Sequence, residues 1–230
     1  MSAVAIITAR GGSKRIPKKN IKDFCGKPII AYSIEAALES NLFEEVMVST
    51  DSEEIAEVAK RYGAKIPFMR SEKNSDDFAT TADVLQEVIS EYEKLGQHYD
   101  YMCCIYPTAP FVTGAKLKQA YQVFVESKAD ILEPVVNFSF PPQRAFVIRE
   151  GKLVYRYPEC ASMRSQDLEN WYHDAGQFYF HNVEIFMKGL SAGEQMKIVP
   201  FELPETEVQD IDNMVDWQLA EMKYKIMSQH

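Results

Sequence analysis

The stretch AVAIITARGGSKRIPKKNI, residues 3–21, joins an apolar run to a basic loop and sets the architecture of the chain. Residues 3–8 predict a buried β-strand, because an unbroken apolar run is typical of a parallel sheet that is covered on both faces. The loop that follows carries five cationic side chains, Arg10, Lys14, Arg15, Lys18 and Lys19. In an open parallel sheet, the ligand crevice lies at the carboxyl ends of the strands. We therefore expect a small phosphate-bearing anion at this loop.

The basic loop is locally positive, whereas the chain as a whole carries a net charge of −9 over 230 residues. Nucleic-acid binding needs a broad basic face rather than a single basic loop, so no nucleic acid partner is expected. Gly11 and Gly12 permit close approach of the backbone to a ligand, but their spacing fits neither the Walker motif nor the dinucleotide motif. The alternative is a solvated turn whose lysines only keep the protein soluble.

Membrane and export signals are not found in the sequence. No apolar run approaches the roughly 20 residues of a membrane helix, and residues 1–7 are too short and uncharged for a secretory signal. The cysteines show no paired spacing, so neither a zinc site nor a disulfide framework is indicated. We expect a cytoplasmic protein with no membrane partner.

Short apolar runs alternate with helical periodicity over the first 136 residues. The pattern predicts strands at 3–8, 45–50, 66–69, 101–106 and 130–136. Between them it predicts helices at 28–40, 51–62, 81–95 and 114–126. This βαβ succession implies an α/β fold with a mostly parallel sheet between two helical layers. The expected architecture is a three-layer, Rossmann-like domain.

The pattern changes after residue 136. Residues 137–172 are rich in aromatic residues and proline, with a hairpin at Arg149–Lys152, which predicts a small antiparallel insertion in a single domain, 1–230. The insertion exposes more apolar surface than a monomer tolerates, which favours a homodimer; the alternative is a flap packed on its own sheet. A strand is expected at 175–181 and a helix at 214–227, with an inward stripe made of Val215, Leu219, Met222 and Ile226.

A second polar cluster lies near the end of the chain, in the run Gln209-Asp210-Ile211-Asp212-Asn213. In an extended backbone the carboxylates of Asp210 and Asp212 point to the same side, which suits a hard cation that also holds phosphate oxygens. The expected cation is Mg²⁺. The alternative makes Asp212 a helix N-cap and Asp210 a turn residue. A phosphate-binding loop elsewhere in the chain favours the metal, because nucleotidyl transfer uses both.

Taken together, several segments resemble the cytidylyltransferases that activate nonulosonic acids. The resemblance spans nearly the whole chain and is carried by ARGGSKRIPKKN, Ser49–Asp51, Arg70–Glu72, Tyr106–Pro110 and Asp210–Asp212. Within the family the chain is similar to the branch that uses pseudaminic acid, on the evidence of Tyr106–Thr108, Arg164–Asp167 and His173–Tyr179. Sialate enzymes usually carry a glutamine before Pro-Thr and Arg-Pro-Asn-Gly in the later segment.

The resemblance implies a nucleotidyltransferase that moves CMP from CTP to the anomeric hydroxyl of a nine-carbon sugar acid, with release of pyrophosphate. Members of the family are homodimers. Synthesis of a CMP-sialic or CMP-legionaminic acid remains an alternative. More distant ones are a sugar-1-phosphate nucleotidyltransferase and a non-catalytic nucleotide-binding regulator.

Individual roles also follow from the resemblance. Catalysis is assigned to Arg10, Lys19, Asp210 and Asp212, with the metal on the two aspartates. The CTP site comprises Arg10, Gly11, Gly12, Ser13, Lys14, Lys19, Asn20, Arg70, Ala79 and Thr81. The sugar-acid site comprises Tyr106, Thr108, Arg164, Gln166, His173, Asp174 and Gln177. Three of these residues have local alternatives: Arg70 as a surface ion-pair partner, Thr81 as a helix cap and His173 as a local hydrogen-bond partner.

Overall fold

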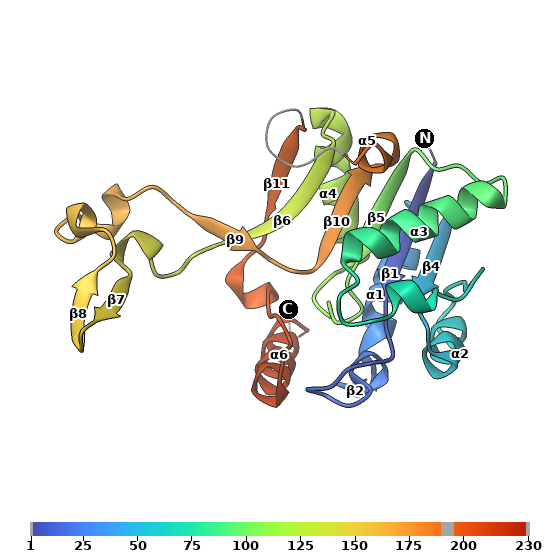
Figure 1. Cartoon of the computed structure of the whole chain (residues 1–230), viewed down its shortest axis with the longest axis horizontal. Coiled ribbons are helices and arrows are strands. Elements are labelled where there is room, and N and C mark those ends of the chain that lie inside the picture. Colours follow the sequence, from blue (N-terminus) through green and yellow to red (C-terminus); the bar gives the residue numbers. More distant parts are fainter. Residues whose placement is uncertain (1, 190–195, 229–230) are drawn as a thin grey trace.

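A seven-stranded sheet forms the centre of the computed structural model, which describes residues 2–189 and 196–228. Figure 1 shows the sheet with its helices and a separate arm that projects from it. The strand order is β11-β6-β10-β5-β1-β4, and β9 pairs with β6. These strands are β1 (Ala3–Thr8), β4 (Glu45–Ser49), β5 (Tyr101–Ile105), β6 (Ile131–Asn137), β9 (Tyr172–Asp174), β10 (Phe178–Asn182) and β11 (Ile198–Glu202).

The sheet is mainly parallel, as the sequence predicts. β1 pairs in parallel with both β4 and β5, and β6 pairs in parallel with β11. β10 lies antiparallel between β5 and β6, and β9 runs antiparallel to β6. The carboxyl ends of β1, β4 and β5 therefore meet at one edge of the sheet, where the loops that follow them gather.

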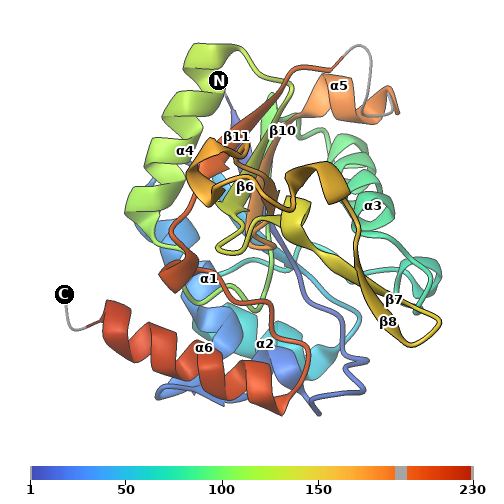
Figure 2. The ribbon, with the colours of Figure 1, turned by 90° about the vertical axis from the view of Figure 1, so that its left-hand side faces the viewer.

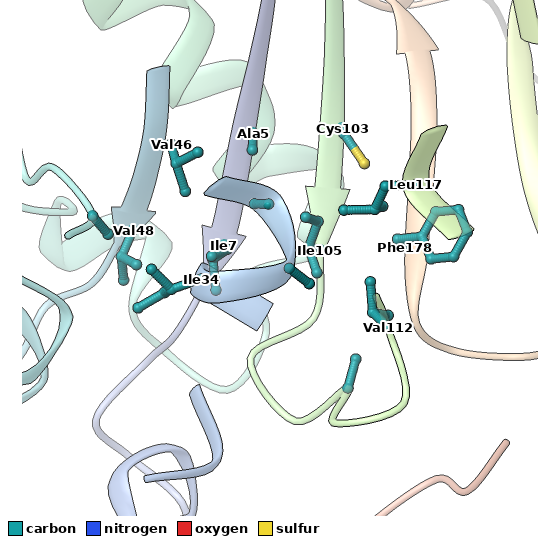
Figure 3. Close-up of a cluster of buried hydrophobic side chains, with 14 of the residues drawn as sticks. Ala5, Ile7, Ile34, Val46, Val48, Cys103, Ile105, Val112, Leu117 and Phe178 are labelled. Carbon is teal, nitrogen blue, oxygen red and sulfur yellow. The ribbon is translucent and has the colours of Figure 1, made fainter. Parts of the chain in front are cut away.

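Helices cover both faces of the sheet and give the expected three layers. They are α1 (Ile29–Ser40), α2 (Glu53–Arg61), α3 (Thr81–Lys94), α4 (Gly114–Ser127), α5 (Val183–Met187) and α6 (Met214–Met227). Figure 2 shows α4 and α1 on one side of the strands and α3 on the other. The apolar run of β1 serves both layers: Ala5 and Ile7 pack with α1, α2 and α4, whereas Val4 and Ile6 pack with α3. Figure 3 shows the first of these clusters.

The predicted strand at 66–69 is wrong. In the structure Lys65 alone bridges to β4: its N–H donates to Val46 O, and its carbonyl accepts from Val48 N–H. Pro67 follows two residues later and has no N–H to extend the ladder. In addition, α5 and β11 were not predicted; β11 contains Pro200 and lies next to one strand of the sheet only.

The predicted insertion contains the expected hairpin. β7 (Phe146–Arg149) pairs with β8 (Lys152–Tyr155) through a turn at Glu150 and Gly151, both with positive φ. Two residues with positive φ are what a type I′ hairpin turn requires. We call residues 138–171 the arm; Figure 1 shows that it projects from the sheet. Large apolar side chains on it are exposed, including Phe140 (86%) and Ile148 (77%).

The inward stripe predicted for α6 is wrong. Val215, Leu219, Met222 and Ile226 are all exposed, and the helix instead buries Trp217 and Ala220. Trp217 packs edge-to-face on Phe24, with ring centroids 5.5 Å apart. Tyr224, on the same side, packs on Phe24 and on Tyr32. Aromatic partners distant in sequence therefore select the buried face of a helix that is apolar on two sides.

Membrane-spanning character is not found in the helices that the structure describes, since none is long and apolar enough to cross a bilayer.

Replacement of Trp217 by alanine should destabilise the fold by about 3 to 5 kcal/mol, because it removes a large side chain that is only 2% exposed. The matched change Leu219→Ala on the exposed stripe should cost about 0.5 kcal/mol. Urea unfolding of the two variants measures both free energies. Equal losses would contradict the assignment of Trp217, rather than the stripe, as the main anchor of α6.

Candidate active site

The basic loop begins where β1 ends and is held at both sides by hydrogen bonds. Gly11 N–H donates to Asp51 Oδ1 at 2.8 Å, and Asn20 Nδ2 donates to Arg10 O at 2.9 Å. A Cβ on Gly11 would lie 3.1 Å from Ser52 Cβ, so its lack of a side chain serves close packing on the start of α2. Ser52 caps α2, so the carboxylate of Asp51 is available to accept the hydrogen bond from Gly11 N–H. Gly12, by contrast, faces open space.

A cavity of about 530 Å³ opens above the loop at the carboxyl ends of β1 and β5. This volume lies within the usual range for small-molecule sites. The lining residues come from four separate parts of the chain: Thr8, Arg10, Ser13, Lys14, Arg15, Lys19, Asn20, Asp77, Tyr106, Pro107, Thr108, Asp210 and Asp212. The structure thus brings together nine of the residues expected at the site, namely Arg10, Ser13, Lys14, Lys19, Asn20, Tyr106, Thr108, Asp210 and Asp212.

Acidic groups from the C-terminal segment compensate part of the loop's charge. Lys19 Nζ donates to Ile211 O at 2.8 Å, and Arg15 pairs with Asp212 Oδ1 at 2.7 Å. Burial lowers the pKa of Lys19, while the charges of Asp212 and Asp210 act in the opposite direction. The wall that faces the loop therefore depends on residues almost 200 positions away, since Arg15 and Asp212 are 197 apart.

Asp212 does not have the helix-capping role that was its alternative. Asn213 caps α6, with its Oδ1 accepting the N–H groups of Val215 and Asp216. Asp216 completes the capping box and accepts the N–H groups of Asp212 and Asn213. The carboxylates of Asp210 and Asp212 both line the cavity.

Five of the expected CTP-site residues lie outside the set that lines the cavity: Gly11 and Gly12 of the basic loop, and Arg70, Ala79 and Thr81. Arg70 is buried and donates to Ser49 O at 2.6 Å and to Ser49 Oγ at 3.0 Å, which rules out a surface ion pair. Burial lowers its pKa. Ala79 N–H donates to Asp76 Oδ1. Thr81 is not the helix cap, because Thr80 caps α3.

Side-chain contacts connect the cavity to β9 and β10. The ring of Tyr106 packs on that of Tyr179, with centroids 5.4 Å apart, and the Tyr179 hydroxyl donates to the carboxylate of Asp174 at 2.7 Å. Burial, with the contact to Asp174, raises the pKa of Tyr179, so the phenol keeps its proton. Gln177 is 2% exposed and donates to Glu207 O. His173 donates from Nδ1 to Asp174 O at 2.9 Å and packs on Phe138, as its local alternative proposed.

Two of the residues expected at the sugar acid belong to the arm and lie apart from the cavity. Arg164 pairs with Asp167 at 2.8 Å on an exposed turn. Gln166 lines a separate hollow of the arm, together with Phe138 and Phe140. Neither residue lines the cavity.

Comparison with known proteins agrees with this geometry. Residues 4–221 match a family model described as "Cytidylyltransferase". The chain belongs to the cytidylyltransferase family. It is 46% identical over 227 residues to the pseudaminic acid cytidylyltransferase of Campylobacter jejuni, covering 98% of this chain and 97% of that one. It is 33% identical over 231 residues to CMP-N,N'-diacetyllegionaminic acid synthase of Legionella pneumophila, covering 96% and 95% of the two chains.

The fold also has relatives among solved cytidylyltransferases. The structure of CMP:2-keto-3-deoxy-manno-octonic acid synthetase complexed with CTP superposes with a TM-score of 0.72 at 20% identity, and the match covers 100% of both chains. At that identity the likeness concerns the fold, which is of the nucleotidyltransferase type predicted from the sequence.

Four residues that line the cavity were not among the site residues expected from the sequence, namely Thr8, Arg15, Asp77 and Pro107, and neither was Tyr179. Asp77 lies in a short acidic run before α3 that has no motif of its own, and its partners are more than 60 positions away. Tyr179 did carry a signal, because it is the last residue of the segment His173–Tyr179, on which the resemblance to the pseudaminic acid branch depends.

Proposed function

We propose that the protein transfers CMP from CTP to the anomeric hydroxyl of pseudaminic acid and releases pyrophosphate. The observation that carries this proposal is a single cavity in which Arg10, Lys14 and Lys19 face Asp210 and Asp212 at the carboxyl end of β1. Such a cavity supplies positive charge for a triphosphate and carboxylates for a cation. Membership of the cytidylyltransferase family and the 46% identity to a pseudaminic acid enzyme support the choice of both substrates.

In the proposed reaction the anomeric hydroxyl gives up its proton to water, and its oxygen attacks the α-phosphorus of CTP. A new P–O bond forms, the bond to the β-phosphate bridging oxygen breaks, and pyrophosphate leaves with the electron pair. Arg10, Lys14 and Lys19 neutralise the negative charge of the phosphates and hold the attacking and leaving oxygens in line. Lys19, whose ammonium is oriented by Ile211 O, is placed to contact the phosphates from the floor of the cavity.

The donor set fits Mg²⁺. Asp210 and Asp212 give the cavity two carboxylates, and no group of three or more acidic, histidine or cysteine ligands occurs in the described part of the chain. Mg²⁺ is commonly held by one or two carboxylates together with substrate phosphates and waters, so a larger protein cage is not required. When bound, the ion would supply charge neutralisation at the transferring phosphate.

Loss of either carboxylate should therefore lower turnover. We expect Asp210→Asn and Asp212→Asn to reduce kcat by on the order of a hundredfold and to raise the Mg²⁺ concentration needed for half-maximal rate. Glu57→Gln, which removes an exposed acid paired with Lys60 on α2, is the control and should change neither value. Pyrophosphate release in a magnesium titration measures both. Wild-type magnesium dependence in the two aspartate variants would contradict the metal role.

The sugar acid is proposed to bind beside Tyr106 and Thr108, next to Tyr179 and Asp174. Tyr106 packs on Tyr179, which is held in place by the hydrogen bond from its hydroxyl to Asp174. A rigid polar pocket rejects stereoisomers that leave a donor or acceptor unpaired, at about 1 to 3 kcal/mol for each buried group.

This rigidity predicts a large substrate preference. Pseudaminic acid should be converted with a specificity constant at least about a hundredfold above that of N-acetylneuraminic acid, the effect of two unpaired groups. Side-by-side assays of CMP-sugar formation, with a legionaminic acid as third substrate, measure the preference. Comparable rates for all three acids would refute the choice of sugar and leave CMP transfer intact. The absence of CMP transfer to any of them would refute the proposed function itself.

A homodimer formed through the arm is part of the proposal. The arm exposes Phe140, Ile148 and Leu153, and its residues Arg164 and Gln166 lie away from their own cavity. A role for those two residues at the sugar acid therefore calls for the cavity of a second copy. We place the reaction in the cytoplasm, which agrees with four free cysteines.

The role of the arm in dimer formation can be tested with a variant that keeps its β-hairpin. Ile148 and Leu153 are paired across β7 and β8, so the double change Ile148→Lys with Leu153→Glu puts opposite charges face to face. This variant should be monomeric by sedimentation and should bind CTP but convert the sugar acid poorly. Val123→Lys, on an exposed position of α4, is the control and should stay dimeric. A dimeric, fully active double variant would exclude the arm as the interface.

A further inference from the structure

A short segment before α3 closes over part of the basic loop. We call residues 75–79 the strap. Arg10 NH1 donates to Asp76 O at 2.9 Å and pairs with Asp77 Oδ1 at 3.0 Å. Lys14 Nζ pairs with the other oxygen, Asp77 Oδ2. The Asp77 carboxylate thus bridges two of the cations that line the cavity, and Asp77 itself is one of the lining residues.

This arrangement is the one that a phosphate group would adopt at the same place. A phosphate presents several anionic oxygens to neighbouring cations, and Arg10 and Lys14 here engage one carboxylate oxygen each. Among the described residues, Asp77 is the only carboxylate that pairs with either cation. The hydrogen bond and charge of Lys14, with those of Arg10, lower the pKa of Asp77, so its carboxylate is ionised near neutral pH.

The strap keeps its own shape independently of the loop. Asp76 Oδ1 accepts the N–H groups of Phe78 and Ala79, each at 2.8 Å, which closes a local turn. Ser75 Oγ donates back to Ser71 O. No backbone–backbone hydrogen bond joins residues 75–79 to residues 9–21 in the described structure. The strap is therefore attached to the basic loop through the side chains of Arg10 and Lys14.

We propose that Asp77 is a gating residue that occupies the phosphate site until a polyphosphate displaces it; the identity of that polyphosphate as CTP rests on the proposed function. The Asp77 contacts are exposed ion pairs, which are weak individually, so a triphosphate that also reaches Lys19 replaces them readily. An anion that contacts Arg10 and Lys14 alone must compete with a carboxylate that is tethered beside them. Asp77 thereby selects polyphosphates over single phosphates.

The chain offers a matched control for this proposal. Glu54 pairs with Lys18 of the same basic loop at 2.7 Å, and neither residue lines the cavity. Asp77→Asn and Glu54→Gln therefore remove the same charge next to the same loop, and only the first removes it from the phosphate site. Inorganic tripolyphosphate and orthophosphate are the probes, with binding measured by calorimetry on the full chain.

Asp77→Asn should bind tripolyphosphate about threefold to tenfold more tightly than the wild type, as expected when an exposed carboxylate with two cationic partners no longer competes. Orthophosphate should gain by a larger factor, and Glu54→Gln should change either affinity by less than about twofold. Unchanged or weaker binding to Asp77→Asn, or an equal gain in Glu54→Gln, would overturn the proposal. Because the probes carry no nucleoside, the result stands apart from CMP transfer: a failure of the proposed function leaves it unaffected.

Discussion

The whole site depends on the compensation of positive charge in the basic loop. Cations crowded at one edge of a sheet repel one another, and the structure offsets this with acids from segments far apart in the chain. Asp212 pairs with Arg15, Asp77 pairs with Arg10 and Lys14, and Glu54 pairs with Lys18. Two of these acids, Asp77 and Asp212, also line the cavity. The ion pairs that balance the charge of the basic loop therefore also help to fix the shape of the cavity.

Apolar packing brings those acids to the loop. Ile211 is buried between Asp210 and Asp212, in the cluster that also contains Ile16, Phe24 and Trp217. Ile16 belongs to the basic loop itself, so one small core joins the two ends of the chain directly beneath the cavity. The carboxylates flanking Ile211 are presented to the cavity because the residue between them points into this core. Local aromatic packing thus positions a pair of charged groups that have little affinity for an apolar surface.

Sequence patterns predicted the parts of this structure that depend on neighbours along the chain. The run of β1, the periodicity of α3 and the turn of the arm are local features, and the basic loop and the Asp210–Asp212 pair follow directly from residue type. The failures have non-local causes. The 66–69 strand fails because Pro67 cannot extend the ladder to β4. The buried face of α6 is determined by the contacts of Trp217 with Phe24 and of Tyr224 with Tyr32. The role of Asp77 was not predicted, because its contacts with Arg10 and Lys14 exist only in the folded chain.

The distance between the two halves of the cavity also has a consequence for biosynthesis. Because N-terminal segments are made and folded first, β1, β4 and β5 can assemble while the C-terminal segment has not yet been translated. The acidic partner of Arg15 is Asp212, which lies 197 positions downstream and is translated later. During that interval the nascent chain presents a cationic loop without its main acidic wall, close to a ribosome rich in phosphate. The strap is translated much earlier than Asp212, so the Asp77 carboxylate is available as a counterion for Arg10 and Lys14 before the C-terminal segment has been made.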